Sequence, residues 1–298
     1  MAQGDIWLYK LKPISLFHLG EKGAEKEAVR EIEHSDSLFG AICWGLLELE
    51  GEDRLKEFLS LFKEKERVPF LLSSAFPFVK EKLLLPRPLG FGKKAKGKIE
   101  IPVGNFEFYE VLPSQIRVFR MPRAMVHREG GNPLPFPFGV LDFAGESGLW
   151  FLVKFLDEGV KKIFDAVLRL LGEEGIGGGR SCGFGRFELV ETKPLKLPET
   201  EEGYLASLFY PEEDEINALT SYDYIPRYSW ISAPGWMSYR AKPVRMIKEG
   251  SIVKPLRPIM GKMVTVTPGG GNYRGPEILR YGYAFLLPVR RERDEAGN

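Results

Sequence analysis

Apolar side chains recur along the chain with two different periods, which predict where strands and helices lie. Alternation at Trp7, Tyr9 and Leu11 predicts a first strand. Two stripes of helical period follow, one before residue 50 and one after residue 159. The stripes consist of Leu38, Ala41, Ile42, Gly45, Leu46 and Leu49, and of Val160, Ile163, Phe164, Val167, Leu168 and Leu171. Each stripe predicts an amphipathic helix.

Local signals predict where these helices begin and end. Ser35 or Asp36 suits the N-cap of the first helix and Asp157 that of the second, because short polar side chains accept hydrogen bonds from free amides. Gly172 fits the C′ position that ends the second helix. A short further helix is predicted at about 55–62.

Three more segments are predicted to be strands. Residues 68–88 are strand-like with a turn near 79–82, residues 148–155 form a continuous apolar run, and residues 184–191 follow a glycine-rich loop. With the segment from about 87 to 145 set aside, the order becomes strand, helix, strand, strand, helix, strand. That is the βαββαβ order of the ferredoxin-like fold.

The segment set aside, about 87–145, has a different composition. It is rich in proline, and its nine Lys or Arg face five acids. Such a segment cannot form a compact helix or a central strand. We interpret it as a long insertion, partly a hairpin, and insertions of this length are either functional or disordered.

A polar stretch with two prolines at 191–203 predicts a domain boundary. A second unit begins with "YLASLFY", continues with an acidic helix start, "PEEDEINAL", and ends with a second glycine cluster before a strand. The predicted fold class is α+β, with two ferredoxin-like (RRM-like) domains. Residues 1–198 form the first, including the insertion and the glycine-rich loop 172–185, and residues 199–298 form the second.

Composition narrows the class of protein. An apolar content of 44% and a charged content of 28% are typical of a soluble globular protein. The sequence shows no signal peptide and no apolar run long enough to span a bilayer. Cys43 and Cys182 form no metal pattern, so we expect reduced cysteines and a cytoplasmic protein. Abundant Lys and Glu, with glutamine only at Gln3 and Gln115, favour a thermophilic source.

The net charge of +1 hides an uneven distribution of charge. Between 220 and 290 there are eleven Lys or Arg and three acids. The same stretch contains Tyr222, Tyr224, Tyr228, Trp230, Trp236, Tyr239, Tyr273, Tyr281, Tyr283 and Phe285. Basic residues interleaved with aromatics suit a nucleic-acid backbone with stacked bases. The alternative is a β-rich domain whose aromatics form its core.

The stretch "GEEGIGGGRSCGFG", residues 172–185, is half glycine. It lacks the Walker spacing, and it follows a helix and opens a strand, the reverse of a dinucleotide loop. Its amides and Arg180 are predicted to face the backbone of a ligand, as in a phosphate-binding nest. A helix cap followed by a flexible connection is the alternative, and it leaves most of the glycines unexplained.

A glycine-rich loop between the last helix and last strand of a ferredoxin-like domain resembles the signature of the RAMP superfamily of CRISPR proteins. "HSDSLFGAI", "EGSIV" and "RYGYAFLLPV" resemble, within it, the family of fourth-numbered subunits of the type III-A (Csm) effector complex. That family binds the repeat-derived 5′ handle of the guide RNA. The resemblance implies that the chain has no nuclease activity of its own. The sequence contains no His-Asp metal doublet and no Gly-Gly-Asp-Asp motif, so we expect no metal and no cofactor. The resemblance also implies contact with the large polymerase-like subunit and with the backbone RAMP subunit.

Carried over by position, the resemblance implies an RNA site on the glycine loop, with the insertion acting as a thumb between guide and target strands. The RNA-binding residues expected on this basis are Gly177, Gly178, Gly179, Arg180, Ser181, Gly183, Gly185, His18 and Arg123. No catalytic residue is expected.

Other functions compete with the scaffold hypothesis. Some RAMP proteins are metal-independent ribonucleases that use a loop histidine, and His18 with His34 would form the acid–base pair if the fold brought them together. Otherwise His18 bonds RNA or a loop carbonyl, His34 belongs to the helix entry and His127 lies on the surface. Asp36 as a catalytic group competes with its role as a cap. An RRM-like RNA binder outside CRISPR systems is a further alternative.

Overall fold

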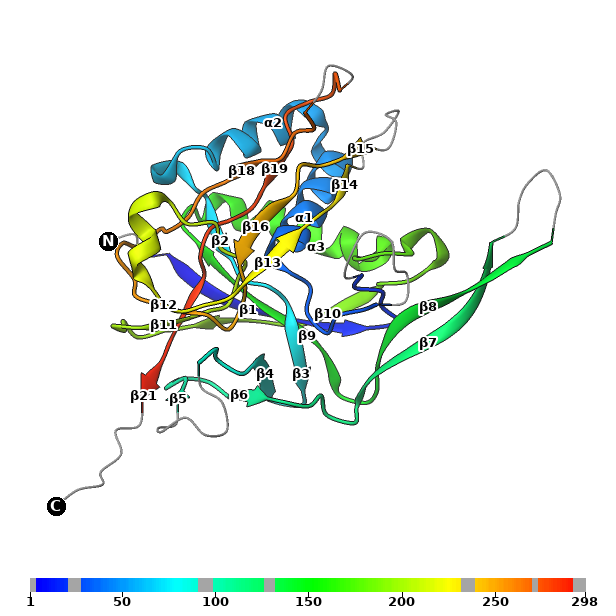
Figure 1. Cartoon of the computed structure of the whole chain (residues 1–298), viewed down its shortest axis with the longest axis horizontal. Coiled ribbons are helices and arrows are strands. Elements are labelled where there is room, and N and C mark those ends of the chain that lie inside the picture. The colour runs from blue at the N-terminus through cyan, green and yellow to red at the C-terminus, as the bar shows by residue number, and fades with distance from the viewer. Residues whose placement is uncertain are drawn as a thin grey trace.

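The computed structural model describes residues 4–20, 28–90, 99–125, 132–231, 239–269 and 273–291 (Figure 1). Its largest sheet has seven strands in the order β10-β1-β9-β3-β4-β6, with β2 beside β9. The strands are β1 (Asp5–Pro13), β2 (Phe70–Leu72), β3 (Phe76–Val79), β4 (Lys82–Pro86), β6 (Phe106–Tyr109), β9 (Ser147–Phe155) and β10 (Phe187–Leu195). All neighbours are antiparallel except β4 and β6. The predicted first strand and the predicted turn near 79–82 are confirmed.

Three α-helices accompany this sheet, and the predicted helical stripes fall on them. They are α1 (Ser35–Glu50), α2 (Glu52–Leu61) and α3 (Gly159–Glu174). Two glycines allow close packing. A Cβ on Gly45 would lie 2.8 Å from a methyl group of Val167 on α3, and one on Gly172 would lie 2.7 Å from the Phe187 carbonyl oxygen.

The predicted helix ends need correction. Gly172 lies inside α3, and the helix ends at Gly175, whose φ is +88°. Asp157 accepts a hydrogen bond from the amide of Gly159, while Glu158 occupies the N-cap position. Neither Ser35 nor Asp36 is an N-cap, because His34 holds that position. Their side chains instead form hydrogen bonds with residues of the C-terminal half.

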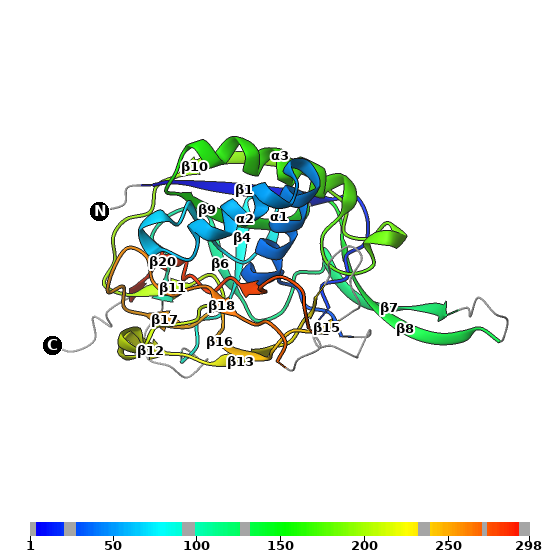
Figure 2. The ribbon, with the colours of Figure 1, turned by 90° about the horizontal axis from the view of Figure 1, so that it is seen from above.

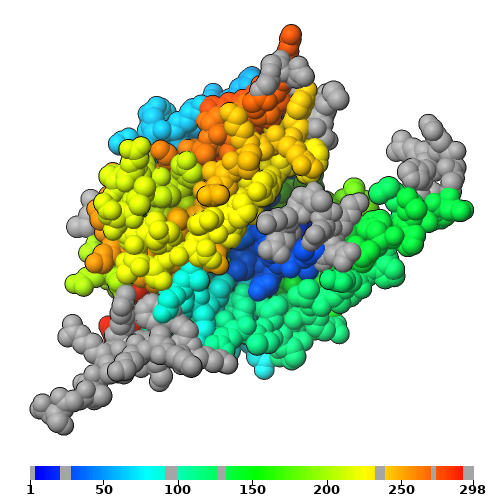
Figure 3. Space-filling view, in the orientation of Figure 1, coloured from blue at the N-terminus to red at the C-terminus, as the bar shows by residue number. Residues whose placement is uncertain are grey.

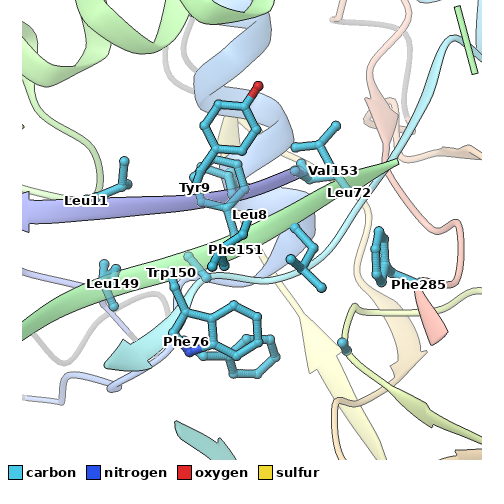
Figure 4. Packing of buried hydrophobic residues seen from close by; sticks show 14 of the residues in the cluster. Leu8, Tyr9, Leu11, Leu72, Phe76, Leu149, Trp150, Phe151, Val153 and Phe285 are labelled. Atoms are coloured by element: carbon cyan, nitrogen blue, oxygen red, sulfur yellow. The ribbon is translucent and has the colours of Figure 1, made fainter. Parts of the chain in front are cut away.

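The core lies on both faces of β9, whose residues are almost all buried. Tyr9 stacks on Phe151 with 5.1 Å between ring centroids, on the side of α3. Trp150 packs on Phe76 at 5.3 Å on the opposite side (Figure 4). The Tyr9 hydroxyl donates to Asp165 of α3 at 2.7 Å, so the buried ring keeps a partner for its polar end.

The C-terminal half is built of short strands. Its largest sheet has the order β12-β17-β11-β20, and the pairs β13–β16, β14–β15 and β18–β19 form hairpins. The strands are β11 (Gly203–Leu205), β12 (Leu219–Ser221), β13 (Tyr224–Arg227), β14 (Trp230–Ile231), β15 (Tyr239–Arg240), β16 (Val244–Ile247), β17 (Ile252–Val253), β18 (Val264–Thr265), β19 (Leu279–Arg280) and β20 (Leu286–Pro288). A last strand, β21 (Arg290–Arg291), pairs with β5 (Ile99–Glu100).

Helical structure in the described part of the C-terminal half is limited to one 3₁₀ turn, Glu213–Ala218. It lies where "PEEDEINAL" predicts a helix start, and it carries a capping box between Glu212 and Glu215. The described residues contain two other 3₁₀ turns, Lys65–Arg67 and Arg180–Cys182.

The two halves share one hydrophobic core. The core cluster joins strands of the large sheet to Tyr204, Tyr281 and Phe285 of the C-terminal half. Hydrogen bonds cross in the same region. The Leu72 amide donates to the Tyr281 hydroxyl at 2.8 Å, and the Tyr283 hydroxyl donates to the Phe62 carbonyl at 2.6 Å. The packing is therefore continuous across the predicted boundary near residue 198.

Buried charges lie at the same junction. Arg227 donates to both carboxylate oxygens of Asp36, at 3.0 and 2.9 Å, and Arg280 donates to one of them. Burial raises the pKa of Asp36, but the two guanidiniums outweigh it and hold that pKa well below its usual range. The Ser35 hydroxyl accepts the Leu208 amide at 2.9 Å. The residues predicted as caps thus join the halves.

The predicted insertion contains one structure that leaves the body and one that belongs to it. β7 (Ile116–Met125) and β8 (Leu134–Phe143) form a two-stranded arm that projects from the body (Figures 1 and 2). The predicted hairpin is confirmed. β6, however, is an edge strand of the large sheet, and Phe106 packs on Trp150 at 5.3 Å. Within the described residues of the predicted insertion, only the arm leaves the body, and its base, at Ile116 and Leu141, still packs in the core.

Candidate nucleic-acid interface

The glycine-rich loop between α3 and β10 closes on itself at its base. The Ile176 amide donates to the Gly185 carbonyl at 3.0 Å. A Cβ on Gly185 would lie 1.9 Å from the Ile176 carbonyl oxygen, and one on Gly175 would lie 2.3 Å from that of Phe184. These positions are buried, and their glycines are required by the approach of the protein's own backbone. Gly185 therefore lies beneath the surface, although it was expected among the RNA contacts.

The loop is also bound to the segment that follows β1. The Gly178 amide donates to the His18 carbonyl at 2.8 Å, and the Gly185 amide donates to the Leu16 carbonyl at 2.8 Å. A Cβ on Gly178 would lie 2.6 Å from the His18 ring. A valine at Gly178 would thus displace His18 whether or not RNA is present, so this substitution cannot test RNA contact.

The tip of the loop offers free donors. Among the described residues, no protein acceptor bonds the amides of Gly177, Gly179, Arg180 and Ser181. Gly177 and Gly179 have φ of +80° and +76°, and residues 177–183 are exposed or half-buried. Successive free amides beside left-handed glycines form the concave donor sets that bind phosphate oxygens.

Arg123 connects the arm to this loop. Its guanidinium lies over the rings of Phe138 on β8 and Phe184 in the loop, at 4.9 and 5.5 Å from their centroids. Its Nη2 donates to the Cys182 sulfur at 2.9 Å. That hydrogen bond is the largest of the causes that lower the pKa of the exposed Cys182 thiol. The arm, the loop and a cation therefore meet at one place.

Two other expected residues have partners of their own. The His18 ring stacks on Phe138 at 4.2 Å, and its Nδ1 lies 2.7 Å from the carbonyl oxygen of Gly139, which belongs to strand β8 and not to a loop. Arg180 lies over Trp44 of α1 at 5.5 Å, with Glu174 at 3.9 Å. The sequence did not identify Phe138 and Trp44 as the partners of His18 and Arg180. The only signal near Phe138 was the strand-like alternation of "NPLPFPFG".

The two histidines considered for ribonuclease chemistry have separate partners. His34 is buried, and its Nδ1 lies 2.7 Å from Glu249, to which Ser74 also donates. Burial opposes ionisation of Glu249, yet His34 and Ser74 hold its pKa below the usual value. His18 belongs instead to the arm and loop. His127, the third histidine, lies outside the described residues.

Most of the aromatics between residues 220 and 290 fall into two groups, while Tyr239 and Tyr273 are half-buried and pack on each other. Tyr281, Tyr283 and Phe285 are buried, as the core alternative predicts. A second group is about half exposed: Tyr222, Tyr224, Tyr228 and Trp230. Trp236 lies outside the described residues. The sequence alone could not separate the two groups.

Neither a metal-binding cluster nor a membrane-spanning helix occurs in the described part of the chain. Among the described residues, no group of three or more His, Cys, Asp and Glu is arranged to hold a metal ion. In the same residues, no helix has the length and apolar character needed to cross a membrane.

Comparison with protein families matches nearly the whole chain. The model of the RAMP superfamily matches residues 32–188, and that of the CRISPR Csm4 C-terminal domain matches residues 199–289. A CRISPR system Cms protein Csm4 of Thermococcus onnurineus is 27% identical over 295 residues, covering 89% of this chain and 94% of the relative. The Csm4 of Mycobacterium tuberculosis H37Rv is 25% identical over 285 residues, covering 86% and 90%.

Solved structures share the fold. A Csm3–Csm4 subcomplex of the type III-A CRISPR-Cas interference complex contains a chain with a TM-score of 0.62 and 20% identity, covering 95% of this chain and 99% of that one. A Csm1–Csm4 cassette in complex with cA4 contains one with a TM-score of 0.59 and 20% identity, covering 96% and 98%. At these identities the likeness concerns the fold.

Proposed function

Because the chain belongs to the RAMP superfamily, within the Csm4 family of type III-A CRISPR systems, we propose that it is a non-catalytic RNA-binding subunit of a cytoplasmic interference complex. Its role is to anchor the repeat-derived 5′ handle of the guide RNA. It also joins the large subunit to the RAMP backbone.

The meeting of arm and loop carries this proposal. Free amides at Gly177 and 179–181 suit handle phosphates, and Arg123 adds a cation beside them. Phe138 and Phe184 hold that cation in place through their ring faces. Donors for phosphate thus lie next to an arm that can reach between strands, as the thumb of the family does.

The partner assignment is supported by the relatives. Their solved structures contain Csm4 with Csm3 in one case and with Csm1 in the other. We propose that this chain contacts the counterparts of both, the backbone subunit and the large subunit. Co-expression followed by size-exclusion chromatography after nuclease treatment tests the second contact, which we expect to survive about 0.5 M salt because an apolar interface is weakly screened.

The domain assignment follows the sheet. We infer that residues 1–198 form a ferredoxin-like RAMP domain, because β10, β1, β9 and β3 lie side by side and α1 and α3 occupy the crossover positions of the βαββαβ order. The expected second ferredoxin-like domain has less support. Among the described residues after 198, no α-helix provides a crossover.

A metal-independent ribonuclease is the competing function, and the positions of the histidines argue against it. His18 stacks beside the loop, whereas His34 is buried against Glu249 at the junction of the halves. General acid–base cleavage needs both groups at one phosphodiester. Incubation with repeat RNA in EDTA distinguishes the two, because the ribonuclease would still cleave.

Handle binding is tested with two matched variants of the arm. Arg123→Ala removes the cation beside the loop, and Arg117→Ala removes an exposed cation of the same strand that pairs with Asp142. We expect Arg123→Ala to weaken handle binding about tenfold, roughly 1.4 kcal/mol, and to flatten the log–log salt dependence by about 0.7. Arg117→Ala should change affinity less than about twofold, roughly 0.4 kcal/mol. Equal effects of the two variants would contradict the proposed site.

A further inference from the structure

A second surface with the chemistry of single-stranded RNA lies on the C-terminal half. The strands β13 and β14 pair with β16 and β15, and the Ala241 amide donates to the Ser229 carbonyl at 3.0 Å between them. Together, 224–231 and 239–247 form one long irregular hairpin. Two-stranded hairpins are marginal alone, so this one must be held by contacts with the body.

The inner face of the hairpin provides those contacts. Arg227 is buried against Asp36, and the Ser229 hydroxyl accepts a hydrogen bond from Arg280 at 2.7 Å. Side chains of a strand alternate between its faces. Because the odd-numbered Arg227 and Ser229 point inward, the even-numbered neighbours point outward.

The outward positions are aromatic except for Pro226. Tyr222, Tyr224, Tyr228 and Trp230 have relative exposures of 53, 49, 53 and 53%. We call these four side chains the aromatic ladder. Positions two apart on a strand are separated by about 6.6–7 Å. Tyr222 and Tyr224 have this spacing, as do Tyr228 and Trp230, while Pro226 lies between the two pairs. Each pair of half-exposed rings leaves π-faces open to unpaired bases.

Cations come from the opposite strand of the hairpin. The Arg240 guanidinium lies over the Trp230 ring at 4.8 Å, and that of Arg245 lies over Tyr224 at 5.2 Å. Lys242, between them in sequence, is exposed. Among the described residues none of these three cations pairs with a carboxylate, whereas Lys248 pairs with Asp223 at 2.6 Å. The face therefore carries uncompensated positive charge beside its rings.

We propose that the aromatic ladder is a second binding surface for single-stranded RNA, separate from the loop and arm, and that an unpaired stretch of the guide RNA occupies it. The proposal rests on the proposed function only for the source of the RNA. Charge complementarity favours a polyanion over an apolar protein surface. The hairpin and the arm lie on the same face of the molecule, so one strand can reach both (Figure 3).

Two triple variants test the stacking. Tyr224→Leu, Tyr228→Leu and Trp230→Leu together keep apolar bulk and remove the π-faces, whereas Tyr224→Phe, Tyr228→Phe and Trp230→Phe keep a ring at each position. Fluorescence anisotropy with an unstructured 12-nucleotide RNA measures affinity. We expect at least tenfold weaker binding for the leucine triple with an unchanged salt slope, and less than about twofold weakening for the phenylalanine triple.

A further variant removes charge and keeps the rings. Arg240→Ala with Arg245→Ala removes two exposed cations, and it should lower the salt slope by about 0.7 for each phosphate that these cations neutralise in the wild type. Crosslinking with 4-thiouridine RNA should label peptide 221–231, and that label should persist in Arg123→Ala. If the label persists, the ladder binds RNA independently of the handle site. Each of the two proposed sites can then be refuted without affecting the other.

Unchanged RNA affinity of the leucine triple, with an intact thermal transition, overturns the proposal. If the same variant also fails to co-elute with the large subunit, the ladder is a protein interface. Loss of the crosslink to 221–231 in Arg123→Ala likewise overturns a separate site.

Discussion

Asp36→Asn is expected to be among the most destabilising substitutions of a polar residue in this chain. The Asp36 side chain has no exposed surface, and it neutralises Arg227 and Arg280, which are themselves nearly buried. Removing one partner from such a group leaves buried charge uncompensated, which costs about 3–5 kcal/mol. Asparagine keeps the volume and one acceptor oxygen, so we expect the lower end, about 3 kcal/mol.

Urea unfolding followed by tryptophan fluorescence and far-UV circular dichroism measures this loss at pH 7. A cost of that size is a large fraction of the total of about 5–15 kcal/mol that domains possess. The matched control is Asp53→Asn, at a fully exposed carboxylate that lies 4.0 Å from Lys56. Exposed pairs contribute about 0–1 kcal/mol, so the control should unfold almost as the wild type does.

The pH dependence gives a second check on the same reasoning. The pKa of Asp36 is depressed in the folded state. Its contribution is therefore fully present above the unfolded pKa of about 3.9 and is lost as the pH falls through the folded pKa. The difference between wild type and Asp36→Asn should stay constant from about pH 5 to 8. A cost below about 1 kcal/mol, or a difference that disappears within that range, would refute the argument.

Other contacts lead to three further predictions. Burial raises the pKa of Glu33 to about 7. The contribution of the protonated Glu33 to folding stability is therefore complete below the pKa of the unfolded state and is lost as the pH rises to about 7. Glu33→Gln should flatten the pH dependence of the urea midpoint over this range. Gly185→Ala should be at least about 2 kcal/mol more destabilising than Gly183→Ala. Both glycines have positive φ, but only a Cβ on Gly185 would meet backbone, at 1.9 Å from the Ile176 carbonyl oxygen. Equal melting temperatures of the two variants would contradict this prediction. Alkylation of Cys182 by iodoacetamide should shift to higher pH in Arg123→Ala, since the hydrogen bond from Arg123 lowers that pKa; an unshifted rate profile would mean that the contact is absent in solution.

The sequence predicted what depends on neighbouring residues. The period of apolar residues within each segment predicted strand β1 and helices α1 and α3, and the hairpin of the arm was predicted as well. The N-cap assignment of Asp36 used the same kind of local signal and was wrong. Its true partner, Arg227, is 191 residues away, and no local pattern indicates such a contact.

The candidate site shows the same limit. Glycine density predicted the close approach of a ligand backbone, but at Gly185 and Gly175 the approaching chain is the protein's own. The sequence also suggested Arg123, although its position over Phe184 depends on the course of the arm across the loop. That course is set by tertiary packing, so the exposed tip of the loop could be distinguished from its buried base only in three dimensions.

The shared core constrains how this chain can fold during its synthesis on the ribosome. The surface of β2 and the end of α2 is closed by Tyr281 and Tyr283, which bond Leu72 and Phe62. Tyr281 is translated 209 residues after Leu72, and Tyr283 is translated 221 residues after Phe62. The nascent N-terminal part therefore keeps apolar strands uncovered until the segment with both tyrosines emerges. Shortened versions that stop at the apparent boundary near residue 198 would retain that uncovered surface permanently. Trimming for crystals or fusions should therefore begin at the arm, and the carboxyl-terminal strands should be kept.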